Sequence, residues 1–260
     1  MEFLSFDSRT KSLTLKKSDV PIPVGNEILI KVSYSGICGT DLHIIEVRIT
    51  HRRVHLVPDE VDLAQAALAE PLSCLAHGWN KINPVHIGSR ILVIGAGIIG
   101  SLWASLLHLQ GQRKTVTVSE PQAKRRELFE NLDLDFKAVS PSELEGREFD
   151  LVIDCSGCAP AVEAAFSLLG PGGRLCVFGV ASPQAEMKIK PFEIFMKELS
   201  IIGVIINPFA FPKALALLAA MGDRYLDFGK LGIGVYKLSQ YEEALTALKN
   251  GDISKAVFKL

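Results

Sequence analysis

The chain has 260 residues, of which 48% are hydrophobic and 22% are charged, and its 28 basic and 29 acidic side chains give a net charge of -1. This composition is ordinary for a globular protein of one domain with an appendage, or of two domains. The balanced charge argues against a protein that binds nucleic acid or an anionic membrane, because such a protein would carry a basic excess. The five cysteines are odd in number and thinly spread, and residues 1–12 show no apolar run after a basic segment, so we expect a cytoplasmic location.

The first quarter of the sequence is predicted to be rich in β-structure. Apolar residues alternate from Glu27 to Tyr34, after proline and glycine residues that favour loops. From Asp59 to Trp79 the apolar residues recur at helical spacing, with Asp62 in the position of an N-cap and Pro71 as an interruption. We therefore expect a helical connector over this stretch.

Beyond the connector, strands and helices alternate as in a parallel sheet that is covered on both faces. Strands are predicted at 90–94, 115–119, 149–155, 174–180 and 199–206, helices at 98–110, 122–131, 159–169 and 192–196, and a turn at 170–173. Residues 91–107 are mostly apolar but too few for a membrane span, which needs about 20. Repeated units of this kind predict a doubly wound, Rossmann-like sheet, and helices around 214–220 and 241–249 with a closing strand at 257–260 follow it.

A dinucleotide-binding fingerprint lies between the first predicted strand and helix of this sheet. Residues 95–100 read Gly-Ala-Gly-Ile-Ile-Gly, the spacing and the setting of a G-x-G-x-x-G turn. Gly95 permits the tight turn, Gly97 lets the backbone approach a pyrophosphate, and Gly100 allows the helix to pack closely on the strand. The alternative interpretation is a tight turn without a ligand.

The second predicted strand carries conflicting signals about the cofactor. Glu120 lies twenty residues beyond Gly100, where a carboxylate accepts hydrogen bonds from the adenosine ribose of NAD. Ser119 before it and Arg125 and Arg126 after it are what the 2'-phosphate of NADP would need. We favour NAD, because a carboxylate repels that phosphate, and Arg125 and Arg126 can simply be solvated helix residues.

Three motifs together resemble one enzyme family. Residues 36–43 read Gly-Ile-Cys-Gly-Thr-Asp-Leu-His, residues 69–73 read Ala-Glu-Pro-Leu-Ser, and the glycine fingerprint follows. They are similar to the zinc-dependent medium-chain dehydrogenases, particularly the sorbitol, threonine and butanediol dehydrogenase branch. The resemblance implies that Cys38 ligates a catalytic Zn²⁺, that Glu70 lies at the metal or its water, and that Thr40 and His43 form a proton relay.

The resemblance also implies a fold and a reaction. A β-rich, GroES-like catalytic domain would accompany the Rossmann-like sheet, and Ile99 would pack behind the nicotinamide ring while Gly179 and Val180 offer backbone to its carboxamide. The implied reaction transfers hydride between NAD(P) and a polyol or secondary alcohol, with Zn²⁺ polarising the alcohol oxygen. Relatives of this branch form homo-oligomers through the last strand of the sheet, here residues 199–206.

The sequence departs from the family between the first two motifs. Only 31 residues separate Cys38 from Glu70, and the Gly-His-Glu motif and the four-cysteine lobe of the family are missing. His51 and His55 lie in this neighbourhood as substitutes for the missing histidine ligand, or as exposed residues left by the join.

An internal deletion is therefore expected to truncate the catalytic domain. The expected organisation is residues 1–78 as the N-terminal part of the truncated catalytic domain, 79–206 as the dinucleotide-binding domain, and 207–260 as a return to the catalytic domain. The alternative function is a non-catalytic nucleotide-binding variant that associates with full-length relatives. The Cys-x-x-Cys of residues 155–158 is interpreted as a loop that borders the adenosine, without a metal role.

Overall fold

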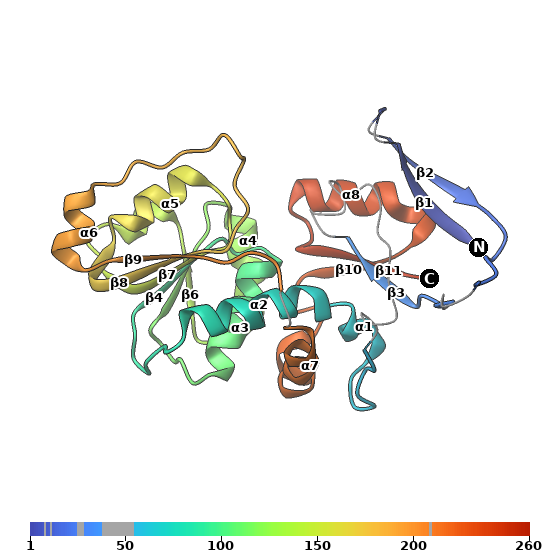
Figure 1. The fold of residues 1–260 in the computed structure, drawn as a ribbon, viewed down its shortest axis with the longest axis horizontal. Coiled ribbons are helices and arrows are strands. Elements are labelled where there is room, and N and C mark those ends of the chain that lie inside the picture. The colour runs from blue at the N-terminus through green and yellow to red at the C-terminus, as the bar shows by residue number, and fades with distance from the viewer. Residues whose placement is uncertain (8, 11, 25–28, 38–54, 208–209) are drawn as a thin grey trace. The chain divides into compact units, whose positions relative to one another are not determined.

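The computed structural model describes the chain except for residues 8, 11, 25–28, 38–54 and 208–209 (Figure 1). Its contacts divide the chain into two compact units. The terminal unit comprises Met1–Leu68 and Gly232–Leu260, and the central unit comprises Ala69–Leu231. Within the described part of the chain, every helix is too short or too polar to cross a membrane.

A six-stranded parallel sheet forms the middle of the central unit, with the order β6-β5-β4-β7-β8-β9. Its strands are β4 (Ile91–Ile94), β5 (Val116–Ser119), β6 (Lys137–Val139), β7 (Phe149–Asp154), β8 (Leu169–Val177) and β9 (Ser200–Gly203). The chain moves outward in one direction from β4 to β6 and then crosses to β7 and continues the other way. This reversal defines a doubly wound sheet, so the predicted fold class is confirmed, although the short strand β6 was not predicted.

Helices cover both faces of this sheet. They are α2 (Ala69–Ile82), α3 (Ile98–Leu109), α4 (Ala123–Glu130), α5 (Ala159–Phe166), α6 (Pro191–Lys197) and α7 (Phe211–Leu226), with a 3-10 turn at Pro141–Leu144. Figure 1 shows α5 on one side of the sheet and α2 and α3 on the other. Every residue of β4 is buried, which is the pattern of a strand covered on both faces.

The helical connector contains two helices, and its break does not fall at the proline. Asp62 is the expected N-cap of α1 (Leu63–Ala66), since its carboxylate accepts hydrogen bonds from the backbone N–H groups of Ala64 and Gln65. The prediction that Pro71 interrupts the helix is wrong. Pro71 is the third residue of α2, within the first turn, where a backbone N–H has no partner inside the helix and its loss costs little.

The glycine-rich stretch 170–173 lies inside β8, where a turn was predicted. Pairing of β7 with β8 jumps from Phe149 opposite Leu169 to Leu151 opposite Arg174. The four intervening residues leave the regular ladder without ending the strand, and Gly172 adopts a φ of 70° that suits glycine. The glycines thus mark an irregularity within a strand.

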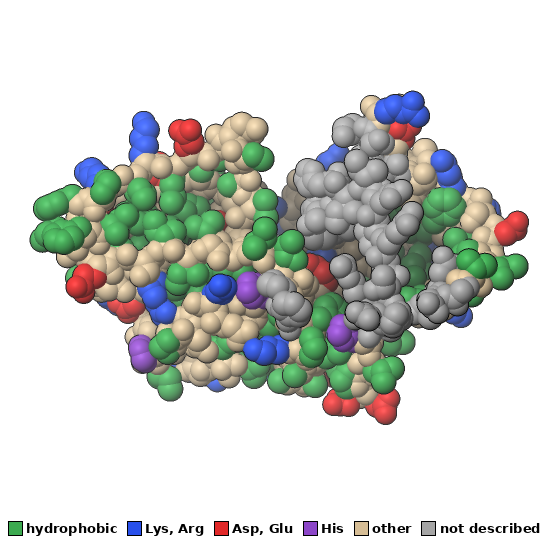
Figure 2. Space-filling model, in the orientation of Figure 1, with side chains coloured by type: hydrophobic (Ala, Val, Ile, Leu, Met, Phe, Trp, Pro, Cys, Tyr) green, Lys and Arg blue, Asp and Glu red, His purple; other side chains and the backbone are tan. Residues whose placement is uncertain are grey.

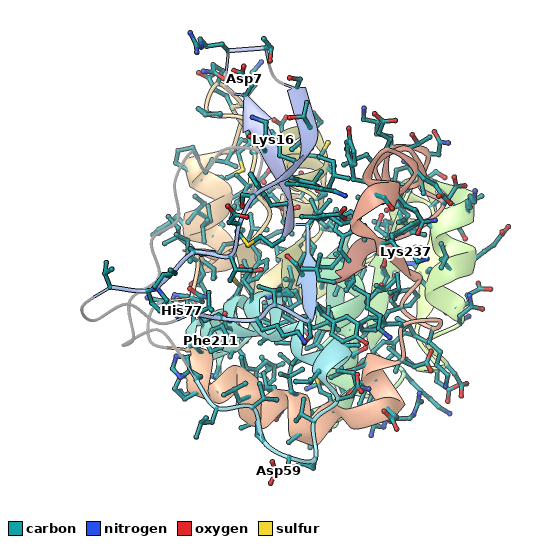
Figure 3. The ribbon with its side chains drawn as sticks, turned by 90° about the vertical axis from the view of Figure 1, so that its right-hand side faces the viewer. Asp7, Lys16, Asp59, His77, Phe211 and Lys237 are labelled. Atoms are coloured by element: carbon teal, nitrogen blue, oxygen red, sulfur yellow. The ribbon has the colours of Figure 1, made fainter. Side chains whose placement is uncertain are left out.

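The terminal unit is built from short β-elements and one helix. Strands β1 (Glu2–Asp7) and β2 (Ser12–Lys17) form an antiparallel hairpin, and β3 (Tyr34–Gly36), β10 (Ile233–Lys237) and β11 (Lys255–Lys259) form a sheet in the order β10-β11-β3. Figure 3 shows Asp7 near the tip of the hairpin and Lys16 on β2. Helix α8 (Tyr241–Asn250) follows a 3-10 turn at Leu238–Gln240. The buried core of this unit is small and includes Ala244, Ala256 and Phe258.

The strand predicted at Glu27–Tyr34 is wrong for most of its described length. Residues 25–28 lie outside the described residues, residues 29–33 are in no strand, and β3 begins only at Tyr34. Leu29, Ile30 and Val32 are 54%, 49% and 47% exposed. A strand forms only where a neighbouring strand pairs with it, and the alternating pattern by itself does not supply that neighbour.

Within the central unit, polar contacts hold the C-terminal end of α7 against α3 and the loop after α4. A kink at Gly222, with a φ of 47°, turns the last residues of the helix toward α3. Tyr225 Oη lies 2.8 Å from His108 Nδ1, and the Arg224 guanidinium donates to the carbonyls of Leu132 and Asp133. Burial lowers the pKa of His108 below its ordinary 6.5, and the guanidinium groups of Arg113 and Arg224 lower it further.

This cluster predicts a loss of stability in mild acid. The unfolded chain takes up a proton on His108 near pH 6.5, whereas the folded chain resists it, so the stabilisation is complete above 6.5 and falls as the pH drops toward the lowered folded value. Urea unfolding between about pH 7.5 and about pH 5.5 should show a smaller pH dependence for His108→Asn than for the wild type. His86→Asn, at an exposed histidine of the same unit, should keep the wild-type dependence. Equal slopes for all three proteins would contradict the assignment.

Candidate nucleotide-binding site

The glycine fingerprint forms the turn between β4 and α3. Gly95 has a φ of 98° in the left-handed region, and its N–H donates to the carbonyl of Ser119 at the end of β5. A Cβ at Gly100 would lie 1.9 Å from the Gly95 carbonyl oxygen, so the chain itself requires glycine there. A Cβ at Gly97 would meet nothing within 4 Å. The packing of the turn therefore does not require glycine at position 97, and the space in front of it is open to a ligand.

Helix α3 begins behind this open space without a side-chain cap. Gly97 is its N-cap and has no side chain to accept the first backbone N–H groups of the helix. These N–H groups and the positive end of the helix dipole attract an anion. Ile99, expected behind the nicotinamide, lies partly exposed in the first turn of α3. The turn thus offers an anion site of the kind that the sequence predicted.

Glu120 ties the glycine turn to the end of β5. The residue is only 3% exposed, and its Oε2 accepts a hydrogen bond of 3.1 Å from the N–H of Ala96. Its Oε1 accepts one of 3.0 Å from the N–H of Gln122. Each carboxylate oxygen keeps a second lone pair, so the group can still accept from a ribose hydroxyl. Its role in cofactor recognition stays a prediction.

The two arginines of α4 differ in their surroundings. Arg126 donates from its guanidinium to the backbone carbonyls of Glu120 and Pro121, at 2.7 and 2.8 Å. Arg126 is therefore engaged with the chain itself, at the base of the loop after β5. Arg125 lies half-buried in the first turn of α4. Neither arrangement decides between a ribose hydroxyl and a ribose phosphate.

Asp154 organises the loop after β7, and the sequence analysis missed it. It is 1% exposed, and its Oδ1 accepts from the Ser156 N–H at 2.9 Å, from the Ser156 hydroxyl at 2.7 Å and from the Gly157 N–H at 3.2 Å. The signal that could have revealed it is a carboxylate at the end of a buried strand, two residues before a Ser-Gly pair. Such a carboxylate must find hydrogen-bond donors nearby, and the following loop supplies them.

The loops after β7 and β8 pack against each other at their glycines. A Cβ at Gly179 would lie 2.3 Å from the Gly157 nitrogen, and a Cβ at Gly157 would lie 2.3 Å from the Val180 carbonyl oxygen. Gly95 is also close to this loop, since its Cβ would lie 3.6 Å from the Cys155 carbonyl carbon. The structure therefore brings Gly95, Gly179 and Val180 together at the carboxyl edge of the sheet, where doubly wound proteins bind their ligands.

The thiols beside this edge are poorly suited to metal or redox chemistry. Burial raises the pKa of the Cys155 thiol well above its ordinary value, and the neighbouring Asp154 raises it further. Burial likewise raises the pKa of Cys176 to about 12. Since the thiolate is the metal ligand and the nucleophile, a raised pKa makes the Cys155 and Cys176 thiols poorer ligands and nucleophiles than ordinary thiols.

Of the two expected metal ligands, only Glu70 lies in the described part of the chain. Cys38, Thr40, His43 and His51 lie outside the described residues. Glu70 is exposed in the first turn of α2, and its Oε1 accepts from the Cys74 thiol at 3.5 Å. No group of three or more His, Cys, Asp or Glu side chains among the described residues could hold a metal ion. A catalytic zinc needs three protein ligands and an open position, and the described donors supply only part of such a set, so the zinc site stays a prediction.

The chain matches dehydrogenases in sequence and in fold. A family model for zinc-binding dehydrogenases matches residues 99–220. The D-arabinitol dehydrogenase 1 of Uromyces fabae is 26% identical over 340 aligned residues, which cover 96% of this chain and 95% of the relative. The D-altritol 5-dehydrogenase of Agrobacterium fabrum is 39% identical over 164 residues, which cover 61% of this chain and 48% of the relative. A zinc-binding dehydrogenase from Sinorhizobium meliloti 1021, crystallised with NADP, shares the fold with a TM-score of 0.79 at 24% identity, and the match covers 96% of each chain.

The lengths of these matches agree with an internal deletion. The alignment with the D-arabinitol dehydrogenase has 340 positions, 80 more than the 260 residues of this chain, so at least 80 positions have no counterpart here. The chain also spans only about half of the D-altritol 5-dehydrogenase. In its motifs, its doubly wound sheet and these matches, the chain is similar to the zinc-dependent medium-chain alcohol and polyol dehydrogenases.

Proposed function

We propose that this chain is an NAD(P)-linked oxidoreductase of the polyol and secondary-alcohol type, which binds its cofactor across the glycine turn of the central unit. The observation that carries the proposal is the open space at Gly97 in front of the uncapped N-terminus of α3. Two of the relatives act on polyols by name, D-arabinitol and D-altritol, which supports a polyol as the substrate class. A cytoplasmic location is part of the proposal, supported by the four described cysteines, none of which forms a disulfide.

Different residues at the carboxyl edge of the sheet bind different parts of the cofactor. The first N–H groups of α3 hold the diphosphate, and Glu120 accepts from the adenosine ribose, which favours NAD over NADP. Ile99 packs behind the nicotinamide, and the backbone of Gly179 and Val180 holds its carboxamide. The bound nicotinamide supplies the hydride acceptor, while Thr40 and His43 pass the alcohol proton to solvent.

A second candidate function is a non-catalytic nucleotide-binding protein. It is supported by the missing Gly-His-Glu motif between Cys38 and Glu70 and by the lack of a metal-binding group among the described donors. Zinc chemistry needs ligands within a few tenths of an ångström of their ideal positions. In this alternative the chain keeps its cofactor affinity and associates with full-length relatives.

A homo-oligomer through the last strand of the sheet is also part of the proposal. Strand β9 is the last strand of the sheet, and among the described residues it pairs only with β8. Exposed apolar side chains gather on it and on α6, as Figure 2 shows over α6. Phe192, Phe195 and Met196 are 70%, 76% and 61% exposed. An open edge beside such a patch is the kind of surface that a second copy covers.

Alanine at two of the fingerprint glycines separates folding from cofactor binding. Gly97→Ala should fold as stably as the wild type, because its Cβ meets open space, yet lose about tenfold or more in NAD affinity, because that space is needed by the diphosphate. Gly100→Ala should lose about 2 kcal/mol of stability through the clash with the Gly95 carbonyl. Titration calorimetry and urea unfolding measure the two effects. Wild-type affinity in a folded Gly97→Ala protein would disprove the site.

Glu120→Ser tests the choice between NAD and NADP. Both affinities should fall, because the Ala96 and Gln122 N–H groups lose their acceptor. The affinity for NADP relative to NAD should nevertheless rise by about tenfold, because a negative charge near the 2'-phosphate is removed. Glu127→Ser, at an exposed residue of α4, is the matched control. An unchanged ratio would show that Glu120 does not contact the ribose.

Turnover distinguishes the two candidate functions. The purified chain is loaded with Zn²⁺, its bound metal is measured, and NADH formation is followed with D-arabinitol, sorbitol, xylitol, threonine and butanediol. We expect NADH formation that depends on a polyol and exceeds that of a Thr40→Ala variant, because Thr40 begins the proposed proton relay. Binding of NAD without stoichiometric zinc or NADH formation would support the non-catalytic function instead.

The mass of the chain in solution tests the oligomer. Sedimentation at micromolar concentration should show a dimer or larger assembly for the wild type and a monomer for Phe195→Glu, because a charge buried against a second copy is costly. Ile87→Glu, which changes an 84% exposed side chain elsewhere in the central unit, should behave like the wild type. A monomeric wild-type protein would rule out the interface.

A further inference from the structure

An open apolar groove lies within the terminal unit. Its volume is about 1130 Å³, somewhat larger than the roughly 300–1,000 Å³ of a typical ligand pocket. It is lined by side chains from the hairpin, from the segment before β3, from α8 and from the end of β11, including Phe3, Leu4, Leu13, Ile30, Leu245 and Phe258. All of its lining residues belong to the same unit, so the groove does not depend on how the two units are arranged.

The groove is the hollow side of an incomplete β-domain. The β1–β2 hairpin and the β10-β11-β3 sheet are separate, and the segment 29–33 between them pairs with neither as a strand. Leu29, Ile30 and Val32 on that segment are about half exposed and line the groove. Contiguous apolar surface of this kind marks a binding site in a natural protein.

Positive charge surrounds this apolar lining. Lys31, Lys237 and Lys259 line the groove, whereas the sole acidic side chain among its described lining residues is Glu2. The Glu2 carboxylate is already neutralised by an ion pair of 3.1 Å with Lys17. The groove therefore combines a mainly apolar lining with three lysines, and it complements a molecule with an apolar chain and one anionic head.

The geometry points to the groove as a binding site for a single-chain anionic amphiphile, a long-chain fatty carboxylate free in solution. Its alkyl chain lies along Leu4, Ile30 and Phe258, and its carboxylate lies among the three lysines. A second copy of the chain fits less well, because a two-fold contact would bring two sets of these lysines into one interface, where like charges repel. This inference does not depend on the oxidoreductase function proposed for the central unit.

Binding of three ligands that share one alkyl chain tests the head group. The full-length chain is titrated by calorimetry with monomeric oleate, oleyl alcohol and oleylamine. We expect one oleate to bind per chain, with an affinity about tenfold higher than that of oleyl alcohol. Oleylamine should bind more weakly than oleyl alcohol, because its positive head group is repelled by the lysines. Absence of oleate binding, or equal binding of oleate and oleylamine, would overturn the inference.

Two kinds of variant test the location. Lys31→Glu combined with Lys259→Glu should lower the affinity for oleate by about tenfold or more and leave the affinity for oleyl alcohol unchanged. Val32→Asp should lower the affinity for both ligands. Lys249→Glu, on an exposed residue of α8 outside the groove, should bind like the wild type. Circular dichroism and unfolding confirm that each variant is folded.

Two competing occupants give different results in the same experiment. A monomer–dimer equilibrium that Val32→Asp abolishes, without oleate binding, would assign the groove to a second copy and overturn the inference. Binding to anionic phosphatidylserine vesicles without binding to monomeric oleate would also overturn it. Oleate binding that survives both the lysine and the Val32 changes would place the ligand elsewhere.

Discussion

Two buried carboxylates organise the edge of the sheet on which the candidate site depends. Glu120 directly follows β5 and Asp154 ends β7, and they are 3% and 1% exposed. A carboxylate at such a position must accept hydrogen bonds, because burying it unsatisfied would cost several kcal/mol. The donors come from the backbone of adjacent loops, namely Ala96 for Glu120 and Gly157 for Asp154. The need to satisfy two acceptors thus fixes two loops at the ends of neighbouring strands, before any ligand arrives.

The central unit could be predicted well from the sequence because its signals are local. The glycine fingerprint, the apolar strand before it and the helix after it all lie within 91–109, and the structure places them as expected. Asp154 escaped prediction although its donors are only two and three residues away, because a single aspartate at a strand end has no distinctive pattern. Strand β6 escaped because three residues give no periodicity.

The terminal unit could not be predicted as well, because its structure depends on contacts between residues far apart in sequence. Alternation at 27–34 describes a segment with one apolar face, but whether it becomes a strand depends on a neighbour that can be far away in sequence. Strand β11 finds such neighbours in β10 and β3, whereas residues 29–33 do not become a strand. The candidate metal site has the same difficulty, since Cys38 and Glu70 are far apart in sequence and neither motif alone fixes where the other lies.

Cofactor binding and turnover are therefore separable properties of this chain. The groups that would hold a dinucleotide, from Gly95 to Val180, lie in one continuous stretch of the central unit, which has its own buried core. The groups expected at the metal are divided between that unit and the one with a smaller core, beside the stretch where the family motif is missing. The hydrogen bonds and glycine contacts that shape the carboxyl edge of the sheet all lie within the central unit. A chain of this construction can keep the affinity of its family for a cofactor independently of whether it keeps the reaction.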